Sequence, residues 1–312
     1  MIGIKYISFA FGKKTIDNIE QGILLDTDKD LIEKKIGVVQ RRQLLDEEDT
    51  ADLASIALDK LFQNSNLLPT QVECLILVTQ NPHDKGLPHT ASILHDKYNL
   101  QKNCATFDIS LGCSGFVYGL AIIHSFMTMQ KMKNGILVTC DPYSKIIDQA
   151  DKNTSLLFGD GGTATWLSTD NPIWFLGKFD FGTDGKGRKD LELGSNGLLY
   201  MNGRAVFNFS ATEVPKSIER TLEINNTSSE EIDQFILHQG SKYLIDTIGK
   251  RINATERTRF FAKQYGNLVS SSIPVVLATE NLDPYKKILI SGFGVGLSWA
   301  STILSRKESN YD

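Results

Sequence analysis

The sequence DISLGCSGFVYGL, residues 108–120, places a cysteine directly after a predicted strand and at the start of a predicted helix. The glycine and serine residues beside Cys113 allow the backbone to turn sharply and leave the sulfur uncrowded. At a helix N-terminus, free N–H groups and the helix dipole favour the thiolate, which is the nucleophilic form of cysteine. We therefore predict that Cys113 is a nucleophile. The alternative is a buried, inert thiol, which is how most free cysteines behave.

Strand and helix patterns follow one another in the same order in both halves of the chain. The first half predicts helices at 51–62 and 90–98 and from about residue 113, and strands at 72–79, 105–110, 135–139 and 162–167. The second half predicts strands at 232–238, 258–263, 287–292 and 299–304, and helices at 242–252 and 267–279. This order indicates an α/β fold built from a duplicated unit, although any α/β chain alternates to some degree.

Composition excludes several classes of protein. The chain has 312 residues and a net charge of −4, so its overall field gives no case for nucleic acid as a partner. No apolar run approaches the ~18 residues that a membrane span needs. The four cysteines lack metal-site spacing, and the glycine clusters match no nucleotide-binding motif, so we expect no metal and no cofactor. The N-terminus has no secretory pattern, and we expect a cytoplasmic protein with reduced thiols.

Three further residues are candidates for the site of Cys113. His238 ends a predicted strand in FILHQG, where side chains project into the ligand-binding crevice of open α/β sheets. Asn267 begins a predicted helix in YGNLVSSSIP, and a helix cap is the plainer interpretation. In the glycine cluster SGFGVGLSW, 291–299, a close backbone approach would aim the N–H of Val295 at Cys113. The backbone N–H groups of Cys113 and Val295 would then hold an oxyanion.

Together these segments resemble the β-ketoacyl-acyl-carrier-protein synthase III family, the initiating condensing enzymes of fatty-acid synthesis. The motifs occur in family order over nearly the whole chain: IGVVQRR (36–42), GCSGF, FGDGG, HQ, YGN with SSSIP, and GFGVGLSWAS. The resemblance implies a homodimer with a thiolase-like fold, a five-layer αβαβα sandwich of two duplicated halves. Residues 1–168 would carry the nucleophilic Cys113, and residues 169–312 would carry His238 and Asn267.

The resemblance also implies the reaction. Cys113 would take an acyl group from a thioester, and His238 and Asn267 would stabilise the enolate that malonyl-acyl-carrier-protein forms on losing CO2. The product would serve fatty-acid or specialised acyl or polyketide synthesis. One alternative is a transferase that moves the acyl group to oxygen or nitrogen without decarboxylation. Another is a non-catalytic subunit of a condensing heterodimer. A papain-like hydrolase shares the Cys–His–Asn order but not its C-G-[SA]-C-[WY] motif.

Departures from the family pattern concern the acyl donor. The family clamps the adenine of coenzyme A between a tryptophan and an arginine, and Leu31 and Lys152 stand at the matching positions. Gly240 follows His-Gln where alanine is common, and Tyr243 replaces an arginine. These changes favour acyl carrier protein over acyl-coenzyme A as the donor.

Three more residues are predicted to contact substrate or carrier. Lys250 and Arg251 form a basic edge that would attract an acidic carrier protein, or are simply a solvated helix end. Leu87, before Pro88, stands where the family has an aromatic residue from the partner's loop, which suggests a reshaped acyl pocket.

Overall fold

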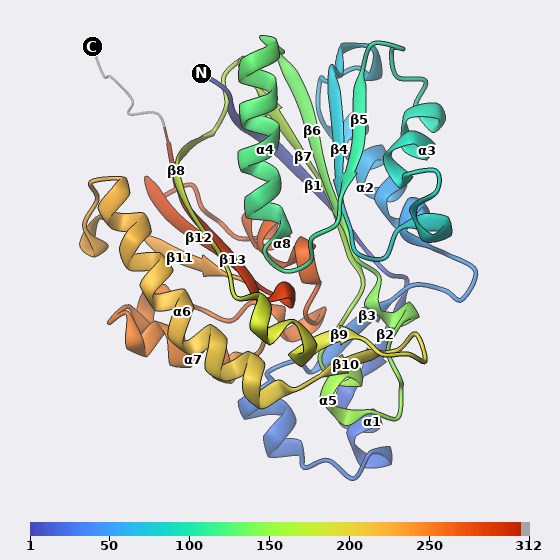
Figure 1. Ribbon diagram of the computed structural model, residues 1–312, viewed down its shortest axis with the longest axis vertical. Helices are drawn as coiled ribbons and strands as arrows, with labels where there is room; N and C mark the ends of the chain where they lie inside the picture. Colours follow the sequence, from blue (N-terminus) through green and yellow to red (C-terminus); the bar gives the residue numbers. More distant parts are fainter. Residues whose placement is uncertain (307–312) are drawn as a thin grey trace.

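The computed structural model describes residues 1–306, which form five layers (Figure 1). Helices α4 and α8 form the central layer, with strands on both sides. Helices α2 and α3 cover the outer face of one group of strands, and α6 and α7 cover the outer face of the other. The bounds of these helices are α2 Thr50–Asn64, α3 Thr90–Lys97, α4 Gly115–Gln130, α6 Gly203–Ile224, α7 Lys242–Arg251 and α8 Ser272–Thr279.

The strands of the two layers run in the order β11-β12-β13-β8-β1-β7-β6-β4-β5. In each group the same pairing occurs: a parallel pair (β4·β6, β11·β12) is followed by two antiparallel pairs. This repetition supports the predicted division after residue 168, which stays a prediction. The bounds are β1 Gly3–Phe11, β4 Cys74–Val78, β5 Ala105–Ile109, β6 Asn134–Cys140, β7 Gly161–Ser168, β8 Trp174–Thr183, β11 Gln234–Leu237, β12 Lys287–Gly294 and β13 Ser298–Ser305.

The central helix α4 is buried because its apolar residues recur at helical spacing. Phe116, Leu120, Ile123 and Met127 are all inaccessible to solvent, as their spacing predicts. They belong to one core cluster with residues of β4, β6, β11 and β12. Burial of such side chains contributes about 25 cal/mol per Å² of apolar surface, so this helix ties the two halves together.

Smaller elements close the lower end of the molecule in Figure 1. They comprise α1 (Asn18–Leu24), the helical turn Leu31–Ile36, α5 (Lys152–Ser155) and two short hairpins. The hairpins pair β2 (Lys14–Asp17) with β3 (Gln40–Gln43) and β9 (Leu191–Leu193) with β10 (Leu199–Met201). Within residues 1–306, no helix is both long and apolar enough to cross a membrane.

Two predicted elements of the second half are wrong in part. The predicted strand 258–263 is reduced to one bridge between Thr258 and Phe235. The N–H of Phe261 donates instead to the side chain of Gln239, at 2.7 Å, which draws the chain away from the sheet. The predicted helix 267–279 begins only at Ser272, because Val269 has a left-handed φ of +53° that a right-handed helix does not permit.

Candidate active site

Three side chains predicted for the site line one cavity of about 400 Å³, namely Cys113, His238 and Asn267. Cys113 follows β5 in the first half of the chain, and the other two come from the second half. The cavity opens among the helical turn Leu31–Ile36, α5, and the N-terminal ends of α6 and α7, at the lower end of Figure 1. The fold therefore brings together a thiol, an imidazole and a carboxamide that lie far apart in the sequence.

Cys113 sits in the tight turn between β5 and α4, where the N–H of Gly115 donates to the carbonyl of Gly112 at 2.7 Å. Only 5% of the residue is exposed. The end of β12 packs directly against it: a Cβ atom on Gly294 would lie 2.7 Å from both Cβ and Sγ of Cys113. This contact brings the next residue, Val295, to the sulfur, and the backbone N–H groups of Val295 and Cys113 both act on the thiolate.

The backbone N–H groups at the helix N-terminus do not alone decide the state of the Cys113 thiol. Burial, with a smaller effect of the Asp141 carboxylate, raises the pKa of the Cys113 thiol to about 12. The N–H groups of Val295 and Cys113 lower this pKa, but by less than burial raises it. The thiol form therefore predominates near neutral pH, and a proton has to leave the sulfur as it attacks.

His238 is held at the end of β11, where its N–H donates to the carbonyl of Ser291 on β12 at 2.8 Å. Its ring packs edge-on against Phe293, with centroids 5.6 Å apart. Burial lowers the pKa of His238 to about 3, although a hydrogen bond with the Val269 backbone raises this pKa by a smaller amount. The imidazole is therefore neutral, and within residues 1–306 its Nδ1 has no hydrogen-bond partner.

Asn267 is positioned by its backbone and by its side-chain oxygen. The N–H of Asn267 donates to the carbonyl of Leu157 at 2.9 Å. The carbonyl of Asn267 accepts from the N–H of Gly159, also at 2.9 Å. A Cβ atom on Gly159 would lie 2.0 Å from the carbonyl oxygen of Tyr265, so only glycine fits this approach. The carboxamide oxygen of Asn267 accepts from the N–H of Val269 at 2.9 Å. This leaves the carboxamide NH2 group to donate into the cavity.

The sequence did not single out the polar groups that support this site. The hydroxyl of Ser298 donates to the carbonyl of Val295 at 3.0 Å and lies 2.7 Å from the hydroxyl of Ser114. These two hydrogen bonds link Ser114, the residue after Cys113, to the Val295 peptide. Behind the turn, the buried carboxylate of Asp141 accepts from the N–H of Gln80 at 2.7 Å. Burial raises the pKa of Asp141 to about 6. A serine or aspartate beside a strand end is too common to be recognised as supporting a site from sequence.

Of the other predicted contact residues, Leu31, Lys152 and Gly240 line the cavity. Tyr243 also lines it and stacks on Phe207, with ring centroids 5.3 Å apart and an angle of 15°. The mouth thus carries an aromatic pair from α6 and α7.

Lys250, Arg251 and Leu87 do not line this cavity. Lys250 is exposed at the end of α7, and the guanidinium of Arg251 donates to the carbonyl of Ala211 at 2.7 Å. Leu87 is 87% exposed, at the tip of the loop between β4 and α3. Within residues 1–306, no group of three or more His, Cys, Asp or Glu side chains is arranged to hold a metal ion.

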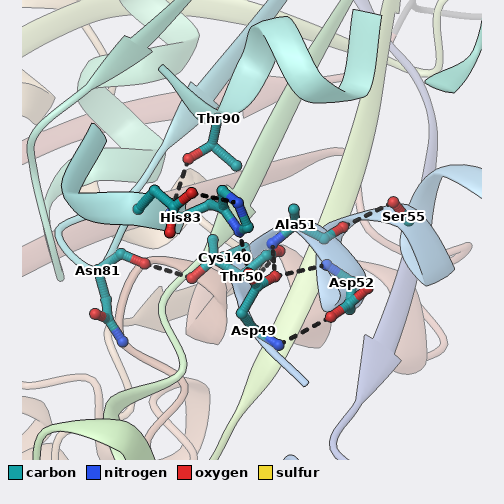
Figure 2. Close-up of polar contacts among 10 residues, drawn as sticks. Asp49, Thr50, Ala51, Asp52, Ser55, Asn81, His83, Thr90 and Cys140 are labelled. Atoms are coloured by element: carbon teal, nitrogen blue, oxygen red, sulfur yellow. Dashed lines mark hydrogen bonds and ion pairs between the residues drawn. The ribbon is translucent and has the colours of Figure 1, made fainter. Parts of the chain in front are cut away.

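A polar cluster fixes the start of the loop that carries Leu87 (Figure 2). The Asp49 carboxylate caps α2, accepting from the N–H of Ala51 at 2.8 Å, and pairs with Nδ1 of His83. The N–H of His83 donates to the hydroxyl of Thr90 at 3.1 Å. The hydrogen bond to Asp49 raises the pKa of His83. Although burial raises the pKa of Asp49, the hydrogen bonds from His83 and the backbone lower it overall.

Comparison with known proteins identifies the family. Models of the 3-oxoacyl-[acyl-carrier-protein] synthase III family match residues 107–185 and, for its C-terminal part, 222–306. The β-ketoacyl-[acyl-carrier-protein] synthase III of Lactococcus lactis subsp. cremoris (strain SK11) is 31% identical, with 94% of this chain and 95% of the relative covered. That of Streptococcus agalactiae serotype III (strain NEM316) is 32% identical, covering 93% and 94%.

Solved structures agree. A 3-oxoacyl-(acyl-carrier-protein) synthase III is 31% identical with a TM-score of 0.91, covering 97% of this chain and 99% of the other. The enzyme of Thermus thermophilus is 28% identical with a TM-score of 0.90, covering 98% and 100%. The fold is therefore the thiolase-like fold of condensing enzymes. Within that class, the chain belongs to the β-ketoacyl-[acyl-carrier-protein] synthase III family.

Proposed function

We propose that the protein condenses an acyl group carried on Cys113 with the two-carbon unit of a malonyl thioester, releasing CO2. The observation that carries this proposal is the single cavity in which Cys113, a neutral His238 and the carboxamide of Asn267 meet. The named activity of the relatives, β-ketoacyl-[acyl-carrier-protein] synthase III, supports the same reaction.

In the first half-reaction the sulfur of Cys113 attacks the carbonyl carbon of an acyl thioester. The developing oxyanion accepts hydrogen bonds from the backbone N–H groups of Cys113 and Val295, which already act on the sulfur. The tetrahedral intermediate then collapses, and its bond to the donor's sulfur breaks. Because the thiol form of Cys113 predominates, its proton passes to the departing thiolate of the donor.

In the second half-reaction a malonyl thioester loses CO2, and the electrons of the broken carbon–carbon bond form an enolate. His238 and Asn267 donate hydrogen bonds to the enolate oxygen. The carbanion attacks the acyl carbonyl on Cys113, a carbon–carbon bond forms, and the cysteine leaves as a thiolate that regains a proton. No base is needed, since decarboxylation itself supplies the carbanion. A neutral imidazole suits this step, because a carboxylate would repel the malonyl group.

The acyl and malonyl groups arrive on an acyl carrier protein in this proposal. Leu31 and Lys152 line the cavity where the family's adenine clamp would stand, and neither offers an aromatic or guanidinium plane for stacking. Lys152 supplies positive charge for a phosphate-bearing arm. Lys250 is free to meet an acidic carrier, whereas the guanidinium of Arg251 is already bonded to Ala211. A donor panel tests this point, and a strong preference for acyl-coenzyme A would contradict it.

The protein acts as a homodimer in this proposal. Strand β5 ends the sheet, so one side of it has no partner strand among residues 1–306. Its apolar Phe107 packs edge-on against Phe126 of α4, and Leu87, in the loop between β4 and α3, is 87% exposed. An unpaired apolar edge strand favours pairing with a second copy. Light scattering tests this, and a monomer at micromolar concentration would contradict it.

The reaction is tested in two steps. The protein is first incubated with acyl thioesters of acyl carrier protein, and its intact mass is measured. Labelled malonyl-acyl-carrier-protein is then added, and the release of CO2 is measured. We expect the acyl mass on Cys113, CO2 release, and loss of both loading and condensation in Cys113→Ala. The altered cavity mouth, with Tyr243 and Gly240, permits the alternative of acyl transfer to oxygen or nitrogen. Loading without CO2 release would favour that alternative, and no loading would favour a non-catalytic subunit.

A further inference from the structure

We propose that the hydrogen bond between Ser270 and the buried carboxylate of Asp141 positions both donors to the enolate, so that Ser270 is a positioning residue for decarboxylation. This inference rests on the proposed function, since the two donors, His238 and Asn267, act in its second half-reaction.

The loop between Asn267 and α8 has a conformation that it does not hold by itself. Val269 has a φ of +53°, and a β-branched residue in this left-handed region is strained. Such a residue persists only where its surroundings fix it. The N–H of Val269 donates to the carboxamide oxygen of Asn267 at 2.9 Å, and a hydrogen bond with the Val269 backbone acts on the ring of His238. Both donors therefore depend on where the Val269 backbone lies.

The serines that follow Val269 fix this loop to the end of β6. The hydroxyl and the N–H of Ser270 both donate to the carboxylate of Asp141, the residue after β6. The hydroxyl of Ser271 donates to the carbonyl of Thr139, on β6, at 3.0 Å. These two serines and their two partners are all buried. Ser270 is the anchor next to Val269, so loss of its hydroxyl should let the strained peptide move.

The Asp141 carboxylate joins the two halves of the chain. Its Oδ1 accepts from the N–H of Gln80 at 2.7 Å and from the hydroxyl of Thr79 at 3.4 Å, and both of these residues follow β4. Its Oδ2 accepts from the hydroxyl of Ser270. Burial of an ionised carboxylate is unfavourable unless hydrogen bonds compensate for it. Hydrogen bonds from these three residues are the largest effects that oppose burial and lower the pKa of Asp141. One rigid group thus fixes the loop of Asn267 against the end of β4.

Cys113 has separate supports, so the two half-reactions should respond differently to changes at Ser270. The hydrogen bond between Gly115 and Gly112 and the packing of Gly294 hold the sulfur, and neither contact involves Ser270. Loss of the Ser270 hydroxyl should therefore slow decarboxylation and leave acyl loading unchanged. A variant that is only destabilised would lose both activities together.

The test measures two rates in the full-length protein: acyl loading of Cys113, by intact mass, and CO2 release from labelled malonyl-acyl-carrier-protein by the loaded protein. Ser270→Ala should release CO2 about tenfold more slowly at saturating substrate, with unchanged loading and an unchanged KM. This loss is smaller than the ~10²–10³ expected for removal of a donor, because the N–H of Ser270 still holds the loop.

Asp141→Asn should slow CO2 release at least as much as Ser270→Ala. Adding Ser270→Ala to Asp141→Asn should cost little more, since both changes act through one hydrogen bond. Asp141→Asn also removes the effect of the carboxylate on the Cys113 thiol, so only its CO2 release is compared.

Ser217→Ala is the matched control. Ser217 is also buried, its hydroxyl donates to the carboxylate of Asp180 at 2.7 Å, and neither residue lines the cavity. Its replacement should lower the melting temperature without slowing CO2 release.

An unchanged rate of CO2 release in folded Ser270→Ala or in folded Asp141→Asn would overturn the inference. So would loading that slows by the same factor as CO2 release in Ser270→Ala, or a double variant whose loss is the product of the two single losses. An unaltered protein that fails to load, or that loads and releases no CO2, would overturn the proposed function instead.

Discussion

Substitution of Gly294 by alanine tests whether the end of β12 sets the position of the nucleophile. A Cβ atom there would lie 2.7 Å from both Cβ and Sγ of Cys113, whereas ordinary contacts are 3.4–4 Å. Either the sulfur or the Gly294 backbone therefore has to move by about 1 Å. A displacement of that size at a reacting atom typically costs about 10² in rate. The added methyl should cost about 1–3 kcal/mol of stability, as overpacking usually does.

The assay is single-turnover loading of Cys113 from acetyl-carrier-protein, followed by intact mass, together with thermal unfolding of the same sample. Gly185→Ala is the matched control, because nothing lies within 4 Å of a Cβ atom at that position. We expect Gly294→Ala to remain folded and to load about 10² times more slowly, and Gly185→Ala to load normally. A folded Gly294→Ala that loads at the normal rate would refute the claim that this contact positions the sulfur.

Three further predictions concern the site and its surroundings. His238→Ala and Asn267→Ala should each slow CO2 release about 10²–10³-fold while Cys113 still loads, measured with labelled malonyl-carrier. With a pKa of about 12, Cys113 should react with iodoacetamide about tenfold faster per pH unit up to about pH 10, and a plateau below pH ~8 would contradict the effect of burial. The raised pKa of His83 means that its pairing with Asp49 is complete below pH ~6 and is lost as pH rises through that pKa. His83→Gln should therefore lower the melting temperature by no more than about 2–4 °C near pH 6, and by less near pH 9.

His124 supplies a control for the histidine substitution. It lies on α4, is half-buried, and lines a different hollow beside the N-terminus. His124→Ala should leave both loading and CO2 release unchanged. A comparable loss of CO2 release in this variant would show that the His238 effect is not specific to the cavity.

The elements with clear periodicity could be predicted from the sequence. The predicted helix 51–62 corresponds to α2, and the predicted strand 72–79 corresponds to β4, with boundaries shifted by two residues or fewer at each end. Apolar spacing decides such elements locally. The predicted strand 258–263 was wrong because a tertiary hydrogen bond, from Phe261 to Gln239, takes the backbone away from the sheet.

The composition of the site was predictable in part. Motifs around Cys113, His238 and Asn267 indicated three polar side chains, and the structure places them in one cavity. The state of the thiol was not predictable, because its pKa depends on how deeply the folded protein buries the sulfur.

The parallel bridge between Phe158 and Asn267 joins the cavity wall at Phe158 to the residue that we propose as a donor to the enolate, through two backbone hydrogen bonds on neighbouring residues. Any rearrangement that enlarges that wall by moving its backbone will also shift the carboxamide. Under the proposed function, substrate range and decarboxylation rate should therefore change together. Variants selected for bulkier primers should regain turnover through second changes near Asn267, whereas a smaller side chain at Phe158, which leaves the backbone in place, should escape this trade-off.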